Sequence, residues 1–225
     1  LITQVTLSLR NKEMLMKKLW IICFMTLVGL HLAAQDIVYS TLKDLLAHKG
    51  DTVAALKIEK RTKNQISLSG GADYKISADD NKALCKYLKG RCYAVQSDTS
   101  LYVNCKKLRY KRLRFGGWYA PAMWLDGNVF FSAVPLGSVA GGSSVTMDVT
   151  LGGSVGDAIA ASGLVSKRVY YEIDATTGKV DFVGKDRMCA LLESYPEWKE
   201  EYLKENSESA KTTGKYLQLL KELDK

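Results

Sequence analysis

The residues best suited to chemistry in this sequence are five acidic side chains. Two carboxylates that face each other can share the acid, base and nucleophile roles of a hydrolase, and this chemistry needs no histidine. The sequence does not show that any two of them converge, so it assigns no catalytic residue. They define one hypothesis, a small carboxylate-dependent hydrolase, with Asp126, Asp148, Asp157, Glu172 and Asp174 as candidates.

Histidine is scarce, and this restricts metal and triad chemistry. The only histidines are His31 and His48, and His31 lies in a segment that we expect to be removed. Zinc sites built on paired histidines are therefore excluded. His48 ends a short amphipathic segment before Gly50, where a cation near a helix C-terminus is favourable for structural reasons. We predict no catalytic residue, no metal ligand and no cofactor.

Four cysteines follow residue 34, and none forms a CxxC pair that would indicate a redox or zinc motif. Residues 92–105 predict a hairpin, in which a two-residue loop of Asp98-Thr99 places Cys92 opposite Cys105. In such a non-hydrogen-bonded pair the Cα atoms approach to about 4.5 Å, which suits a disulfide. Two buried free thiols are the alternative, because a four-residue loop would alter the pairing.

The strongest concentration of charge is a basic segment, Cys105–Phe115, which contains no acid. Basic residues interleaved with apolar ones can bind an anionic partner such as a lipid headgroup or an acidic glycan, and they can also protect a sheet edge from other chains. Trp118 and Tyr119 follow Gly116-Gly117, as in some sugar-stacking surfaces, although core packing explains them equally well. The basic residues are Lys106, Lys107, Arg109, Lys111, Arg112 and Arg114.

A second unusual segment, at about 137–166, is rich in Gly, Ser and Ala. A strand, a glycine turn and a short helix there would resemble a phosphate cradle. Leu151 occupies the first glycine position of the dinucleotide motif, however, and no Gly-Lys-Ser/Thr follows. We therefore predict a long loop.

The remaining pattern predicts an α+β fold: an antiparallel sheet of hairpins with an N-terminal helix, one mid-chain helix and a C-terminal helical segment. The helices are expected at 41–48, 78–88 and, near the C-terminus, 187–194, 197–206 and 210–223. Strands are expected at 53–59, 65–69 and 74–76. Beyond the 92–105 hairpin, one hairpin turns at Asp126-Gly127 and another joins 169–173 to 179–183.

The N-terminal residues predict export. Met16 begins a stretch with two lysines, an apolar run and small residues at Ala33-Ala34, which is the layout of a cleaved secretory signal. The apolar run covers only about 12–14 residues, short of the ~20 that span a membrane. We therefore expect residues 1–15 to come from an upstream start assigned by mistake, 16–34 to be the signal peptide, and 35–225 to form one domain.

Charge then gives little evidence for nucleic acid. The net charge of +8 falls to +5 once residues 1–34 are removed. This excess is mild, and an exported protein meets no chromosome, so we predict no nucleic-acid partner. We also predict no transmembrane helix in the mature chain.

Five short patterns of the sequence are distinctive as a set: 102–105 (YVNC), 131–135 (FSAVP), 151–159 (LGGSVGDAI), 169–174 (VYYEID) and 178–180 (GKV). Taken together they resemble one known family. It comprises exported proteins of Gram-negative gut anaerobes and is classed only as a domain of unknown function. The resemblance implies export and a single domain from about 39 to 220, and it carries no catalytic residue.

Two functional hypotheses follow. The first is a non-catalytic binding or structural module in the periplasm or on the cell surface of a Gram-negative bacterium, which contacts a glycan, an anionic envelope component or a protein. The second is the exported hydrolase. An enzyme would show two acids facing each other across a deep cleft, whereas a module would show a filled core and a flat or basic face.

Overall fold

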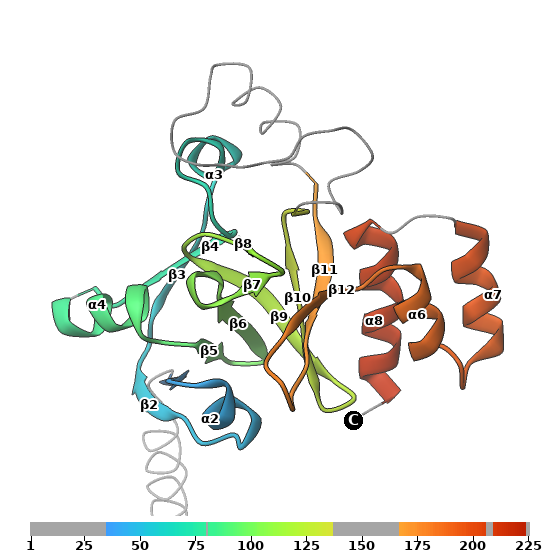
Figure 1. Cartoon of the computed structure of the whole chain (residues 1–225). Helices are drawn as coiled ribbons and strands as arrows, with labels where there is room; N and C mark the ends of the chain where they lie inside the picture. Colours follow the sequence, from blue (N-terminus) through green and yellow to red (C-terminus); the bar gives the residue numbers. More distant parts are fainter. Residues whose placement is uncertain (1–34, 80, 137–166, 206–208, 224–225) are drawn as a thin grey trace, which may run out of the picture. The chain divides into compact units, whose positions relative to one another are not determined.

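The computed structural model describes residues 35–79, 81–136, 167–205 and 209–223 (Figure 1). The described residues from 36 onwards belong to one compact unit. The glycine-rich segment predicted as a loop and the predicted signal peptide lie outside the described residues. In the described residues, no helix is long and apolar enough to cross a membrane.

Most of the described chain belongs to one sheet. Its twelve strands, among the residues described, follow the order β2-β1-β5-β6-β9-β10-β11-β12-β7-β8, and β4 joins β3 to β9. All pairs with a described register are antiparallel except β12 with β7, which pair in parallel at Val180 and Tyr110. The strands are β1 (Gln35–Tyr39), β2 (Asp51–Ala54), β3 (Lys57–Lys60), β4 (Tyr74–Ser77), β5 (Ala94–Ser97), β6 (Ser100–Asn104), β7 (Arg109–Tyr110), β8 (Leu113–Arg114), β9 (Tyr119–Leu125), β10 (Asn128–Ala133), β11 (Val169–Ile173) and β12 (Val180–Phe182).

Helices are short in the first half of the chain and gather at its C-terminus. The first helix in the described residues, α2, spans five residues, and its N-cap Thr41 accepts a hydrogen bond from the backbone N–H of Asp44. The helices are α2 (Leu42–Leu46), α3 (Lys63–Ser69), α4 (Lys82–Gly90), the 3-10 turn η1 (Cys105–Lys107), α6 (Lys185–Leu191), α7 (Pro196–Glu205) and α8 (Ala210–Leu223).

The predicted fold class is therefore wrong. Instead of an antiparallel sheet of hairpins with an N-terminal helix, the protein is mostly a large mixed sheet with helices mainly at the C-terminus. The first element in the described residues is a strand, and the expected N-terminal helix is reduced to little more than one turn. The cause is that two-residue strands such as β7 and β8 leave no periodic signal, and a parallel pair joins segments that are far apart in the sequence.

One predicted strand is in fact a helix. Residues 65–69 belong to α3, because Thr62 and Gln65 form a reciprocal capping box that satisfies the first N–H groups of the helix. The helix ends at Gly70, which has a positive φ of 61°.

The three predicted hairpins are present, and the registers predicted for the 92–105 and Asp126-Gly127 hairpins are confirmed. Leu125 pairs with Asn128 across Asp126-Gly127, and both turn residues have positive φ, as a type I′ turn requires. Ser97 pairs with Ser100, and Ile173 with Val180. These hairpins are local, so their alternation and turn residues are visible in the sequence.

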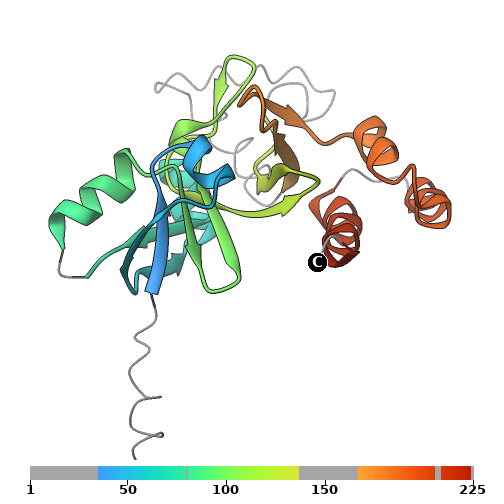
Figure 2. The same cartoon turned by 90° about the horizontal axis from the view of Figure 1, so that it is seen from below.

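The sheet is buried on both faces. In β10, Val129 and Phe131 belong to one core cluster, whereas Phe130 between them packs with α6, α7 and α8 in another. A third cluster lies under α4 and includes Leu88, Val95 and Tyr119. Figure 2 shows α4 and the C-terminal helices at opposite ends of the sheet, as does Figure 1. The basic segment lies at the β7–β8 end of the strand order.

Candidate functional site: a basic pocket at the β7–β8 end of the sheet

The basic segment leaves the sheet through a turn that a buried asparagine holds. The side-chain oxygen of Asn104 accepts the N–H of Lys106 at 3.1 Å, and its amide donates to the carbonyls of Leu88 and Cys92 at 3.1 and 2.9 Å. Asn104 is 1 % exposed. Its hydrogen bonds therefore fix the point at which η1 begins and β7 follows.

Alternation then separates the charges from the core. Leu108 and Tyr110 are buried in the first core cluster, whereas Lys107, Arg109 and Lys111 are exposed. Lys111 has a positive φ of 54° and lies in the turn between β7 and β8. Lys107, Arg109 and Lys111 are consequently all exposed, at alternate positions of one short segment.

These three cations line a cavity of about 580 Å³, which we call the basic pocket. A second segment, Gly178–Asp181, closes it from the other side, because β12 pairs in parallel with β7. The pocket has four cations, one carboxylate and an apolar floor, and its lining residues are Leu42, Tyr93, Lys107, Leu108, Arg109, Lys111, Gly178, Lys179, Val180 and Asp181.

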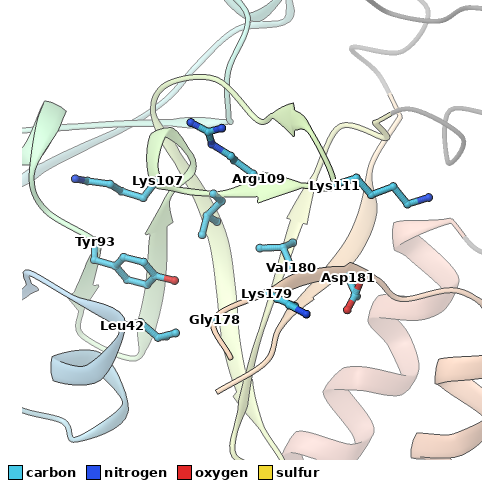
Figure 3. A pocket seen from close by; sticks show the side chains of 10 residues that line it. Leu42, Tyr93, Lys107, Arg109, Lys111, Gly178, Lys179, Val180 and Asp181 are labelled. Atoms are coloured by element: carbon cyan, nitrogen blue, oxygen red, sulfur yellow. The ribbon is translucent and has the colours of Figure 1, made fainter. Parts of the chain in front are cut away.

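The cations of the basic pocket lie outside the ion pairs that the described residues form. Among the residues that the structure describes, none of its four cations forms an ion pair. Figure 3 shows Lys107, Arg109 and Lys111 fanning out in different directions, whereas Tyr93, Leu42 and Val180 lie around the centre. The pocket therefore presents a positively charged rim around an apolar centre.

Tyr93 contributes a phenol that stays neutral in ordinary conditions. Its side chain is partly buried, and burial raises the pKa of Tyr93 to about 12. A neutral hydroxyl can donate a hydrogen bond to an anionic oxygen. Sequence reasoning missed Tyr93, Leu42 and Lys179, because only long-range pairing brings these residues to the basic segment.

The predicted basic residues divide between two cavities. Lys107, Arg109 and Lys111 line the basic pocket, whereas Lys106 and Arg114 line a second cavity of about 350 Å³ with Lys89 and Trp118. We call this second cavity the Trp118 pocket. Arg112 is exposed in the turn that leads to β8. The structure thus brings the six cations to one region but not to one site.

The predicted cysteine pair has the expected register but no bond. Ala94 pairs with Val103, which is the register that would align Cys92 with Cys105. Both thiols are free, and they belong to different core clusters. The strand ends at Asn104, and Cys105 already belongs to η1, so the alternation of the hairpin stops before it reaches Cys105. The disulfide stays a prediction.

Two of the described acidic candidates, Glu172 and Asp174, accept hydrogen bonds from neighbouring groups of the protein. Arg187 binds both oxygens of Glu172 at 2.7 Å, and Asn128 donates to the same group at 2.7 Å. Asp174 accepts the backbone N–H of Thr177 at 2.6 Å, and this bond lowers the pKa of Asp174. Asp126 lies in its tight turn with a φ of 51°. Asp148 and Asp157 lie outside the described residues.

His48 is exposed, and its ring lies 5.1 Å from that of Trp124. In the described part of the chain, no three side chains among His, Cys, Asp and Glu gather as a metal site would require.

Comparison with known proteins identifies the family. A model of a family of unknown function, DUF6563, matches residues 37–224. The chain belongs to this family. No curated protein and no solved structure matches the chain. Membership of DUF6563 agrees with an uncharacterised domain over nearly all of the described residues, and it assigns no activity.

Proposed function

We propose that the chain is an exported, non-catalytic module of the cell envelope of a Gram-negative gut anaerobe, and that it binds an anionic envelope component through the basic pocket. The observation that carries the binding proposal is that four cations from two separate segments, unpaired within the described residues, surround one cavity that contains a single carboxylate. Export rests on the N-terminal pattern that begins at Met16.

A protected sheet edge does not account for the whole arrangement. Charges that discourage edge pairing are needed on the terminal strand, and β8 is that strand in the described sheet. Lys107 lies on η1 and Lys179 just before β12, so neither of them belongs to the edge strand β8. Their convergence on one cavity supports ligand binding instead.

The hydrolase hypothesis has no supporting feature in the described residues. A general acid needs a proton to donate near neutral pH, and desolvation without a cationic partner is the usual way to keep one. Glu172 is instead bound by a guanidinium, and Asp174 by the N–H groups of its own turn. We therefore do not propose an enzyme.

Binding is tested with the protein purified from cells that express the full chain. Its affinity is measured for phosphatidylglycerol vesicles and for polygalacturonate, each beside a neutral counterpart, over a range of salt concentrations. We expect preference for the anionic probe, and affinity that falls with salt because exposed charges are screened over about 8–10 Å.

The decisive variant is Lys107→Gln/Arg109→Gln/Lys111→Gln. Its matched control is Lys43→Gln/Lys63→Gln/Lys86→Gln, which removes the same charge from three other exposed positions. We expect only the first variant to lose binding. Equal losses in both variants, or none in the first, would contradict the proposal.

Export is tested separately by cell fractionation and N-terminal sequencing. We expect a shortened chain that begins near Gln35 in the periplasmic or envelope fraction. An intact chain found only in the cytosol would overturn this part of the proposal.

A further inference from the structure

The Trp118 pocket combines an aromatic ring with positive charge. Three cations from three separate elements surround it: Lys89 at the end of α4, Lys106 in η1 and Arg114 in β8. Tyr119 also lines the cavity, but its hydroxyl already donates to the carbonyl of Leu88 at 2.7 Å. The cations are thus the charged groups that this cavity offers to a ligand.

Trp118 is held in a backbone conformation that large side chains seldom adopt. Its φ is 72°, a conformation that persists only where the surroundings enforce it. Two hydrogen bonds of 2.9 Å enforce it: the carbonyl of Trp118 accepts the N–H of Cys105, and the carbonyl of Gly117 accepts the N–H of Ala72.

The neighbouring backbones meet so closely that only glycine fits. A Cβ on Gly71 would lie 2.3 Å from the carbonyl oxygen of Gly117. Gly71 and Gly116 also have positive φ angles, of 84° and 87°. The turn that carries Trp118 is therefore fixed against the segment that follows α3.

A buried guanidinium fixes the indole ring as well. Arg61 is 8 % exposed and lies 5.4 Å from the ring centroid of Trp118. Arg61 is itself held by hydrogen bonds of 2.6–2.9 Å to Gln65, Ser69, Gly70 and Ala72. Trp118 remains only partly buried although this shell positions it, so a rigid aromatic surface lines the cavity.

We propose that the Trp118 pocket binds a carboxylated sugar ring, such as a uronic acid unit of an acidic glycan. The C–H face of a sugar ring packs on the electron-rich face of an indole, and the cations bind the sugar carboxylate. The cavity of about 350 Å³ lies at the lower end of the range for small-ligand sites, roughly 300–1,000 Å³. This inference deepens the proposed function and rests on it for the anionic class of ligand.

The test uses trigalacturonic acid and its methyl ester, titrated calorimetrically into the protein obtained from the full chain. The variant Lys106→Gln/Arg114→Gln removes two rim cations at exposed positions, where little effect on folding is expected. The variant Trp118→Phe keeps an aromatic ring but shortens it. Lys43→Gln/Lys63→Gln is the matched control for charge.

In the calorimetric titrations, we expect the wild type to bind the acid more tightly than the ester. In NMR spectra, we expect the indole resonance of Trp118 to shift when the acid binds. The double variant should bind the acid about tenfold more weakly or worse, as expected for central binding residues, whereas the control should not change. Trp118→Phe should weaken acid and ester alike, because it acts on stacking and not on charge.

The outcomes separate the two proposals. If trigalacturonic acid binds but only the Lys107→Gln/Arg109→Gln/Lys111→Gln variant loses it, the inference about the Trp118 pocket is wrong and the basic pocket is retained. If acid and ester bind equally, or neither binds, the inference is also overturned. If polygalacturonate binding withstands all of these variants, both proposals fail.

Discussion

At the scale of single residues, burial decides which cysteines can react. Cys92 and Cys105 are fully buried, and desolvation raises the pKa of both thiols. Cys85 and Cys189 are only partly buried. Because the thiolate is the reactive form, we expect an alkylating reagent to modify Cys85 and Cys189 first, and Cys92 and Cys105 only after unfolding. Peptide mass mapping at increasing urea concentrations measures this order.

The same experiment tests the predicted disulfide. If Cys92 and Cys105 are bonded, they resist the reagent even in the unfolded chain until a reductant is added. Free thiols in different core clusters, as in the structure, become reactive on unfolding alone. The disulfide predicted from the hairpin register requires the first result, and the alternative of two buried free thiols requires the second.

Tyr93 makes stability depend on pH in the alkaline range. Its phenol has a pKa near 10 when unfolded and of about 12 when folded, because burial favours the neutral form. The unfolded chain therefore loses the proton first. The contribution to stability is complete below about pH 10 and is lost as the pH rises to about 12, at up to roughly 1.4 kcal/mol per pH unit.

The variant Tyr93→Phe removes this proton. We expect its unfolding free energy, measured by urea denaturation at several pH values, to decline less steeply between about pH 10 and pH 12 than that of the wild type. Equal slopes for the two proteins would show that burial of Tyr93 does not perturb its titration.

At the scale of residues, the sequence predicts which residues are charged and exposed better than it predicts which of them line the same cavity. The six basic residues stand together in the sequence, and all six are exposed as expected. Their division between two cavities depends on the alternation around Leu108 and on the turn at Lys111. Lys89 and Lys179 come from distant segments, so no local sequence pattern predicts that they line these two cavities.

At the scale of elements, the contact between the turns at Gly71 and Gly116 determines the Trp118 pocket. We expect Gly71→Ala to destabilise the protein by more than about 2 kcal/mol, because the new methyl group adds overpacking to a positive φ. Gly70→Ala is the matched control, since Gly70 has a positive φ of 61° but nothing lies within 4 Å of the place that a Cβ would occupy there.

The control should cost only the conformational strain of alanine at a φ of 61° and a ψ of −166°, about 1–3 kcal/mol, and Gly71→Ala should cost more than the control because of its overpacking. Chemical denaturation of both variants measures the difference. Similar losses would mean that the two backbones can separate without cost. In that case the rigidity that we ascribe to Trp118 would also be wrong.

Elements were predictable where their signals are local. The Asp126-Gly127 hairpin combines alternation with a turn that needs positive φ, and the C-terminal helices have apolar stripes and Pro196 at the start of α7. The error at α3 has the opposite cause: its capping box at Thr62 and Gln65 is a helix signal, but the helix buries only Ile66 and shows no clear apolar stripe. β7 and β8 form only through their partners.

At the scale of the whole molecule, the C-terminal helices complete the core of the sheet. Phe130 and Met123 from the sheet pack with Tyr216 and Leu217 of α8 in one cluster. Without the helices, this apolar face of β9 and β10 would meet water. We therefore infer that sheet and helices unfold together, since neither can bury its apolar surface alone.

Leu217→Ala tests this cooperativity. Leu217 is completely buried, so its truncation should cost about 2–5 kcal/mol, whereas Leu223→Ala on the same helix, at a site 56 % exposed, should change stability by less than about 0.5 kcal/mol. In one variant Trp124 of β9 is the only tryptophan left, and in another it is Trp198 of α7. The fluorescence of the remaining tryptophan then reports on the unfolding of the sheet or of the helices separately. We expect Leu217→Ala to shift both signals to the same lower denaturant concentration. If the Trp198 signal moves while the Trp124 signal stays in place, the helices are an independent unit and the sheet does not need them.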